Sequence, residues 1–347
     1  FFIWVIKNKL TKEFREYIQA QPKFFTIFFI LFFLSGIIST FVSPDLRKAT
    51  GQFLVLFLMP MLVYFPAGFI LANPINKIRF VKIIFLAVSV VSIYGIIQYF
   101  TLIGLPSQWW GNANEPKRIL SFFEYPNAFA LYLAPLLAFL LPFVRQGALK
   151  NRVYKASYGL GLIALLLTLS RGGWLGFLVA LGVYILFFAE KKERLAALTG
   201  FFVATLIVLA TPNLRYRVIL PFMGEKSTVS RFSLWQTADK MINDSPILGK
   251  GLYGFKSNYD KYNSDPNLPS INYPHNIFLN FWVETGALGL ISFLGLSYFF
   301  VTKAIKRKGL LSIATILFLT ALYFHGLADA PYFKNDLALI FWILLSL

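Results

Sequence analysis

The sequence predicts an all-α polytopic membrane protein, a bundle of at least ten transmembrane helices with one large external loop. Three observations favour this class. The chain is 57% hydrophobic and 14% charged, with a mean hydropathy of +0.65, whereas a soluble domain has about 25% charged residues. Apolar stretches of near membrane length recur along the chain. Its Lys and Arg residues gather in alternate connections between these stretches.

Each apolar stretch is expected to be helical, because backbone groups find no water in hydrocarbon and must pair within the segment. Most stretches approach the ~20 residues that cross ~30 Å of lipid as a helix. The chain opens on Phe1 and its last stretch is short, so both ends are expected to be trimmed. The predicted spans lie at approximately 24–43, 51–72, 80–102, 126–144, 153–169, 172–189, 195–211, 276–302, 309–328 and 337–347.

Basic residues in short connections predict the orientation, because they mark the cytoplasmic side of a membrane protein. They gather near 7–23, 77–82, 145–155, 191–194 and 303–308. This pattern predicts a single membrane domain with its N-terminal helices in 1–211, an external loop at 212–275 and its C-terminal helices in 276–347. The net charge of +18 is thus a topology signal, and membrane lipids rather than nucleic acid are the expected partners.

The external loop contains one predicted helix. In "STVSRFSLWQTADKMIND", the residues Phe232, Trp235, Ala238 and Ile242 recur near helical spacing. They predict a short amphipathic helix that rests on the membrane or on the bundle. "NDSP" should end this helix and "LGKGLYGF" should turn the chain back. The polar stretch 256–274 that follows is predicted to be a mobile flap.

Unusual polar residues gather on the predicted external side. His275 precedes a long apolar stretch, and Arg171 is fixed in the tight connection "LSRGG". The planar fork of arginine suits phosphate oxygens, and histidine suits general-base chemistry near neutral pH. With Arg231 and Arg118, these residues predict a site for a lipid phosphate or diphosphate at headgroup level. Since the chain has no cysteine and two histidines, neither disulfides nor a metal or other cofactor are expected.

Each of these residues also has a structural interpretation that the sequence leaves open. His275 can cap a helix together with Asn276. Arg171 can extend to lipid headgroups, and Arg231 can be a solvated helix residue. The evidence for Arg118 is weaker still.

Acidic residues near the predicted site are equally ambiguous. Glu284 lies ~13 Å past His275 at 1.5 Å per helical residue. A carboxylate at that depth is costly and is a functional candidate, but it can also satisfy a neighbouring helix end. His325 and Asp329 share a helix face, where they can form a structural pair or support the site.

These motifs resemble the O-antigen ligase and O-antigen polymerase superfamily of bacterial envelope enzymes. His275 and Asn276 are followed by Gly286 and Gly289 in the family register of His-Asn, nine residues and Gly-x-x-Gly. Further similar elements are "SFFEYPNAFALYLAP", "LSRGGWLG", "SRFSLWQTADKMINDSPILGKGLYGF" and "HGLADAPYFKNDLALIFW". The resemblance covers roughly 118–347, and the chain shows fewer spans than the family usually does.

The resemblance implies a GT-C-like glycosyltransferase of the bacterial cytoplasmic (inner) membrane that acts on the periplasmic face. Its donor would be a glycan on undecaprenyl diphosphate and its acceptor a glycan or lipid A-core sugar, with inversion and without a metal. His275 corresponds to the catalytic base, and Arg171 and Arg231 to diphosphate-binding arginines. Arg118 would join them. The residues expected to support the site are Asn276, Glu284, Tyr273, Trp235 and Asp329.

Other functions remain open. A polysaccharide polymerase and a protein O-oligosaccharyltransferase differ from the ligase only in the acceptor, which no residue distinguishes. A small-anion or sugar transporter is the alternative from another class. Against it, the sequence shows no inverted repeat and no sign of a broken mid-span helix pair, the usual pointers to such folds.

Overall fold

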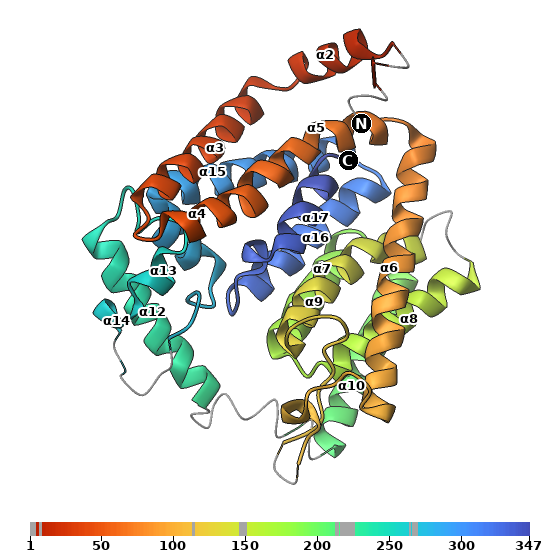
Figure 1. Cartoon of the computed structure of the whole chain (residues 1–347). Coiled ribbons are helices and arrows are strands. Elements are labelled where there is room, and N and C mark those ends of the chain that lie inside the picture. Colours follow the sequence, from red (N-terminus) through yellow and green to blue (C-terminus); the bar gives the residue numbers. More distant parts are fainter. Residues whose placement is uncertain are drawn as a thin grey trace. The chain divides into compact units, whose positions relative to one another are not determined.

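The computed structural model describes residues 5–6, 9–112, 115–145, 151–211, 215, 226–263, 265 and 270–347, and over these residues the regular structure is helical. Every stretch predicted as a span contains a helix (Figure 1). These helices are α3 (Lys23–Val42), α4 (Leu46–Gln52) running through the π-helical η1 (Phe53–Leu58) into α5 (Met59–Leu71), α6 (Pro74–Thr101), α7 (Pro126–Arg145), α8 (Arg152–Leu167), α9 (Arg171–Phe187), α10 (Lys191–Ala210), α15 (Ile277–Arg307), α16 (Leu310–Gly326) and α17 (Asn335–Leu345).

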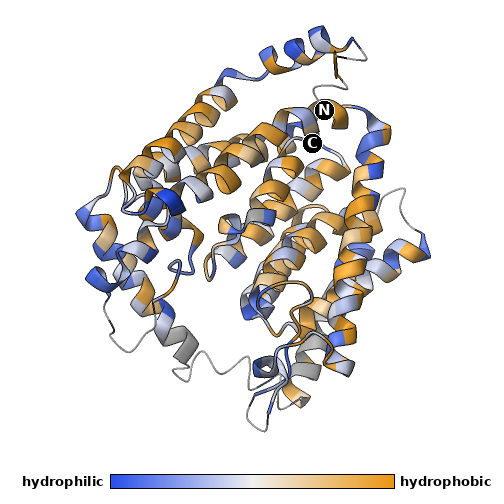
Figure 2. Cartoon of the chain, viewed as in Figure 1, coloured by the Kyte–Doolittle hydropathy of each residue, from blue (hydrophilic) through white to orange (hydrophobic). Residues whose placement is uncertain are grey.

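Five helices among the described residues are long and apolar enough to cross a membrane. They are Lys23–Val42, Leu46–Leu71, Pro74–Thr101, Pro126–Arg145 and Ile277–Arg307. Figure 2 shows hydrophobic residues along the length of these helices. Three shorter apolar helices correspond to α9, α16 and α17. The chain is therefore a helical membrane protein, and the count of ten spans stays a prediction.

The chain divides into two compact units. The first unit comprises 1–81, 233–306 and 329–347, and the second comprises 82–232 and 307–328. The candidate residues are divided between them. His275, Tyr273, Asp329, Glu284 and Trp235 belong to the first unit with Asn276, and the three arginines belong to the second.

The second unit is built around α7, which is almost entirely buried and packs against α8, α9 and α16. Close approach of α9 to α16 requires glycine. A Cβ at Gly176 would lie 2.7 Å from the carbonyl oxygen of Ala321, and one at Gly172 would lie 2.7 Å from His325 Cδ2. The small residues therefore let the two helices pack closely.

An aromatic cluster forms part of the core of the first unit. Phe281 and Phe293 stack with ring centroids 4.1 Å apart, and the fully buried Tyr332 contacts both rings. The Tyr332 hydroxyl donates to the carbonyl of Leu56 at 2.7 Å and accepts from Trp342 Nε1 at 3.1 Å. Because a buried hydroxyl is stable only when it is hydrogen-bonded, these contacts fix the short 3₁₀ helix η4 (Pro331–Phe333) that carries Tyr332.

Helix α15 is broken at Gly286, whose φ of 64° and ψ of −171° are not helical. A loop replaces the hydrogen bonds lost at the break: Lys250 N donates to Val283 O at 2.6 Å, and Ala287 N donates to Pro246 O at 3.0 Å. A Cβ on Gly286 would lie 2.0 Å from the carbonyl oxygen of Ile247. Glycine is therefore required at the break in α15. No pair of broken helices was expected from the sequence, and this single break was not predicted.

The predicted amphipathic helix is present as α12 (Lys226–Asp244), and it ends where the sequence predicts. Its buried face differs from the prediction. Ala238 and Ile242 are buried as expected, together with Leu234 and Met241, but Phe232 is 57% exposed. The buried residues pack against Phe255, Tyr259 and Val283, so this part of α12 rests on the first unit's own core.

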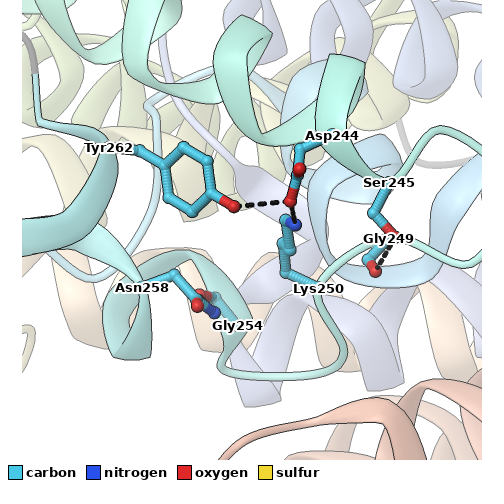
Figure 3. Close-up of polar contacts among 7 residues, drawn as sticks. All are labelled: Asp244, Ser245, Gly249, Lys250, Gly254, Asn258 and Tyr262. Atoms are coloured by element: carbon cyan, nitrogen blue, oxygen red, sulfur yellow. Dashed lines mark hydrogen bonds and ion pairs between the residues drawn. The ribbon is translucent and has the colours of Figure 1, made fainter.

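The chain after α12 is folded back by a polar cluster (Figure 3). The Asp244 carboxylate accepts hydrogen bonds from Lys250 Nζ and from the Tyr262 hydroxyl. The bond from Lys250 is the main reason that the pKa of Asp244 lies below its usual range. Two short helices follow, α13 (Gly254–Ser257) and α14 (Tyr259–Tyr262), and the beginning of the predicted flap is thus helical. Residues 264 and 266–269 of the flap lie outside the described residues.

Candidate functional site

The helix α15 is capped by Asn276 and not by His275. The Oδ1 atom of Asn276 accepts hydrogen bonds from Phe278 N at 3.0 Å and from Leu279 N at 3.2 Å, which satisfies two of the free amides at the helix start. His275 precedes this cap with a left-handed backbone, φ 51°. Its imidazole is therefore available for a different contact.

That contact is a hydrogen bond with Asp329. Nδ1 of His275 lies 3.2 Å from Oδ1 of Asp329, and the Asp329 side chain is 2% exposed. Oδ1 of Asp329 also accepts the amide of Ala330 at 2.8 Å, which holds the carboxylate in place. This contact favours the interpretation that Asp329 supports the site, which stays a prediction. The ring of His325 lies beside Gly172 of α9.

The pairing defines which nitrogen of His275 can react. A carboxylate accepts hydrogen bonds, so Nδ1 carries the proton and Nε2 presents its lone pair. Nε2 has no hydrogen-bond partner within the described part of the chain, and the His275 side chain is 22% exposed. A carboxylate on Nδ1 also stabilises the imidazolium that forms when Nε2 takes a proton. This arrangement is chemically suited to general-base catalysis.

Tyr273 packs against the imidazole ring of His275. Its ring and that of His275 are edge to face, with centroids 4.8 Å apart and an interplanar angle of 66°. The Tyr273 hydroxyl accepts a hydrogen bond of 2.6 Å from Lys334 Nζ. The sequence interpretation did not single out Lys334. Its position five residues after Asp329, in the same predicted external turn, is the signal that could have identified it.

Glu284 has a structural partner. Its side chain is buried, and its carboxylate accepts the backbone amide of Tyr253, which follows the loop inserted at the break in α15. This contact favours the interpretation that Glu284 satisfies neighbouring backbone. Trp235 is half-buried on α12, and no contact between Trp235 and His275 is among the described interactions.

The three candidate arginines meet at the N-terminal end of α9 in the second unit. Arg171 is the first residue of α9. Arg118 Nε donates at 2.8 Å to the carbonyl oxygen of Thr168, which lies three residues before Arg171. Arg231 Nε donates to Ala328 O at 3.2 Å. The Cβ of Ala328 lies 3.9 Å from the position of a Cβ on Gly172, the second residue of α9. The second unit therefore brings the arginines together.

The three guanidinium groups differ in what holds them. Arg118 is bound to the chain by Thr168 O and by Asn127 Oδ1, the latter at 2.8 Å, and it lies over the Trp109 ring at 5.3 Å. These contacts give Arg118 a structural role near the N-terminal end of α9. Arg171 and Arg231 are half-buried, and the amides of the first turn of α9 add positive potential beside Arg171, which favours an anion there.

Comparison with known proteins agrees with these features. Residues 156–294 match the family model described as O-antigen ligase. This match confirms the resemblance to the O-antigen ligase superfamily. The matched segment includes Arg171, Arg231, His275 and the Gly286–Gly289 motif, whereas Arg118 and Asp329 lie outside it.

An uncharacterized protein of Haemophilus influenzae is 23% identical to the chain. The match covers 55% of this chain and 58% of the relative, so the chain spans little more than half of that protein's length. The apolar helices show a membrane protein, and the family match shows that a segment of it is similar to O-antigen ligases.

Proposed function

We propose that this chain is a GT-C-like membrane glycosyltransferase that transfers a glycan from undecaprenyl diphosphate to an acceptor hydroxyl on the periplasmic face of the inner membrane. The proposed acceptor is a sugar of a lipid A-core, as in an O-antigen ligase. The observation that carries the proposal is the His275–Asp329 pair at 3.2 Å, which orients Nε2 as a base.

In the proposed reaction, Nε2 of His275 removes the proton of the acceptor hydroxyl as its oxygen attacks the anomeric carbon of the donor. The new glycosidic bond forms while the bond from that carbon to the diphosphate oxygen breaks. Asp329 stabilises the imidazolium during this step, and attack from the back side inverts the anomeric centre. A positioned general base contributes roughly 10²–10⁴-fold to such a rate.

We assign the diphosphate leaving group to Arg171 and Arg231, with Arg118 in support. Negative charge grows on the diphosphate as its oxygen separates from the anomeric carbon, and preorganised cationic donors stabilise that charge. The proposal gains support from the gathering of the arginines at the start of α9.

The decisive experiment supplies purified protein with labelled undecaprenyl-diphosphate glycan and one acceptor at a time. The acceptors are lipid A-core, a second lipid-linked glycan and a hydroxyl-bearing protein, which report ligase, polymerase and O-oligosaccharyltransferase activity respectively. We expect labelled lipid A-core, and no product with His275→Ala. Lack of transfer to every acceptor by correctly folded wild-type protein would contradict the proposal.

One observation favours the transporter alternative, namely the break in α15. Broken helices in transporters expose backbone groups that bind substrate or ions. In α15, however, the chain's own loop occupies the break, through the bonds of Lys250 N and Ala287 N. Uptake of labelled anions or sugars into proteoliposomes tests this alternative. Uptake without any transfer product would establish it in place of the transferase.

A further inference from the structure

We propose that Lys334, acting through Tyr273, is a positioning residue that holds the imidazole of His275. The catalytic consequence of this inference rests on the proposed function, whereas the positioning itself does not. All the residues concerned belong to the first unit.

The imidazole of His275 needs a second support. Its one hydrogen bond, from Nδ1 to Asp329, fixes a single atom of the ring and allows the ring to turn about that contact. The backbone adds strain, because φ is 51° and a residue with a Cβ adopts the left-handed region at a cost of roughly 1–2 kcal/mol. Since the side chain is 22% exposed, packing does not enclose the ring either.

Tyr273 supplies that support. Its ring meets the imidazole edge to face at 4.8 Å, a geometry that aromatic pairs prefer. The adjoining Pro274 is buried, and it restricts the backbone between the two rings. Rotation of the imidazole away from Asp329 is therefore opposed as long as the Tyr273 ring stays in place.

Lys334 keeps the Tyr273 ring in place by two interactions. Its ammonium donates to the hydroxyl at 2.6 Å and lies 4.5 Å from the ring centroid. Hydrogen bonds from charged donors are stronger than neutral ones, and the cation–π contact adds to them.

Lys334 and Asp329 are the two flanks of one rigid connector. Between them lies η4, whose Tyr332 is fully buried and bonded to Leu56 O and Trp342 Nε1. The connector thus holds the imidazole at two points, directly through Asp329 and indirectly through Lys334 and Tyr273. The alternative is that Lys334 ties Tyr273 locally without affecting the imidazole.

The test measures how readily the imidazole reacts with diethyl pyrocarbonate, followed by the ultraviolet absorbance of the modified ring. The chain has two histidines, and His325 is 2% exposed, so the folded protein should react at His275 alone. A His275→Gln variant verifies the assignment. The proteins compared, in detergent, are wild type, Lys334→Met, Lys334→Arg, Tyr273→Phe and the control Lys303→Met, which removes another lysine that lies over aromatic rings of the same unit.

We expect the modification rate of His275 to rise about 2- to 10-fold in Lys334→Met. This range corresponds to the loss of one hydrogen bond with a net free energy of roughly 0.5–1.5 kcal/mol. Tyr273→Phe should show a smaller rise because the ring remains. Lys334→Arg should restore the wild-type rate, and Lys303→Met should not change it. Equal rates in wild type, Lys334→Met and Tyr273→Phe would overturn the proposal, as would an equal rise in Lys303→Met.

Two further measurements keep the test decisive. Modification of both histidines in Lys334→Met would mean unfolding, and the milder Tyr273→Phe variant then decides alone. Where the protein transfers glycan, Lys334→Met should lower kcat with little change in the KM for donor, and Lys334→Arg should recover kcat. A changed modification rate without any transfer activity would refute the proposed function while leaving the positioning inference intact.

Discussion

At the scale of single residues, the assignment of His275 depends on the different contacts that His275 and Asn276 make. Asn276 accepts hydrogen bonds from the amides of Phe278 and Leu279 at the start of α15. The side chain of His275 is not needed for this cap and contacts Asp329. A histidine that only capped the start of a helix would not need a buried carboxylate on Nδ1. The structural interpretation that the sequence left open for His275 is therefore the weaker one.

The first prediction compares His275 with Glu284. We expect His275→Ala to lower glycan transfer by roughly 10²–10⁴-fold, the contribution of a positioned base. Glu284→Gln should cost much less, because a glutamine oxygen can still accept the Tyr253 amide. Transfer rates and thermal stability of both variants in detergent provide the measurement. A more severe loss in Glu284→Gln than in His275→Ala would point to proton-coupled transport.

The second prediction concerns the arginine fork. Lysine keeps the charge of arginine but loses the planar pair of donors that contacts two phosphate oxygens at once. Arg171→Lys and Arg231→Lys should therefore each weaken transfer by an amount on the order of 2.7–4 kcal/mol, or somewhat less. If these arginines do the work of a divalent ion, transfer should also survive EDTA.

Matched variants make the arginine prediction specific. Lys117→Arg, at a neighbouring lysine whose Nζ donates to the carbonyl of Tyr99, serves as a control and should leave transfer unchanged. Full activity in both lysine variants would favour simple contact with lipid headgroups. Activity abolished by EDTA and restored by magnesium would also exclude the arginine mechanism.

At the scale of elements, the sequence predicted what is encoded locally. The helices follow the apolar stretches because membrane-length hydrophobic segments are helical whatever their neighbours are. The end of α12 at Asp244 follows from the turn-forming residues after it. The buried face of α12 was only partly predicted. Phe232 is apolar yet exposed, and the core that α12 contacts is completed by Phe255, Tyr259 and Val283 from other segments.

Long-range contacts account for what the sequence did not predict. Gly286 was recognised as a motif residue, but its left-handed φ depends on a loop that lies some forty residues earlier. The pairing of His275 with Asp329 joins residues 54 positions apart. A competing partner, His325, was nearer in sequence to Asp329. Spacing within one helix cannot decide between such partners, because the choice depends on how separate helices pack.

The third prediction tests the break in α15. A Cβ on Gly286 would overlap the carbonyl of Ile247 at 2.0 Å, and φ 64° is strained for any L residue. Gly286→Ala should therefore displace the 246–251 loop and destabilise the protein. The loss should exceed the ~1 kcal/mol by which alanine is favoured over glycine in a regular helix. The midpoint of thermal unfolding in detergent measures the change. Gly182→Ala on α9, where a Cβ would meet nothing within 4 Å, is the matched control.

An unchanged or raised midpoint in Gly286→Ala would mean that α15 is continuous, because alanine favours a regular helix over glycine. Gly182→Ala should be neutral or slightly stabilising for the same reason. The contrast separates an effect of the break from a general effect of alanine in a membrane helix.

At the scale of the whole molecule, orientation in the membrane decides which residues can reach the proposed lipid-linked donor on the periplasmic face. The alternation of basic connections predicts that the polypeptide between α10 and α15 is external and that the connection before α10 is cytoplasmic. This prediction is independent of the chemistry at His275. It is also a precondition for the proposed donor, since a site on the cytoplasmic side could not use a glycan displayed in the periplasm.

The last prediction tests that orientation directly. The chain has no native cysteine, so single substitutions give unambiguous labelling. Asp260 lies at the exposed surface of α14 and Lys192 at the exposed start of α10. In cells with a permeable outer layer and an intact inner membrane, a membrane-impermeant maleimide should label Asp260→Cys and should label Lys192→Cys only after lysis. Because both side chains are exposed, a difference in labelling reports membrane side rather than burial. Labelling of Lys192→Cys but not Asp260→Cys in intact cells would invert the topology and, with it, remove His275 from the compartment where the donor and acceptor meet.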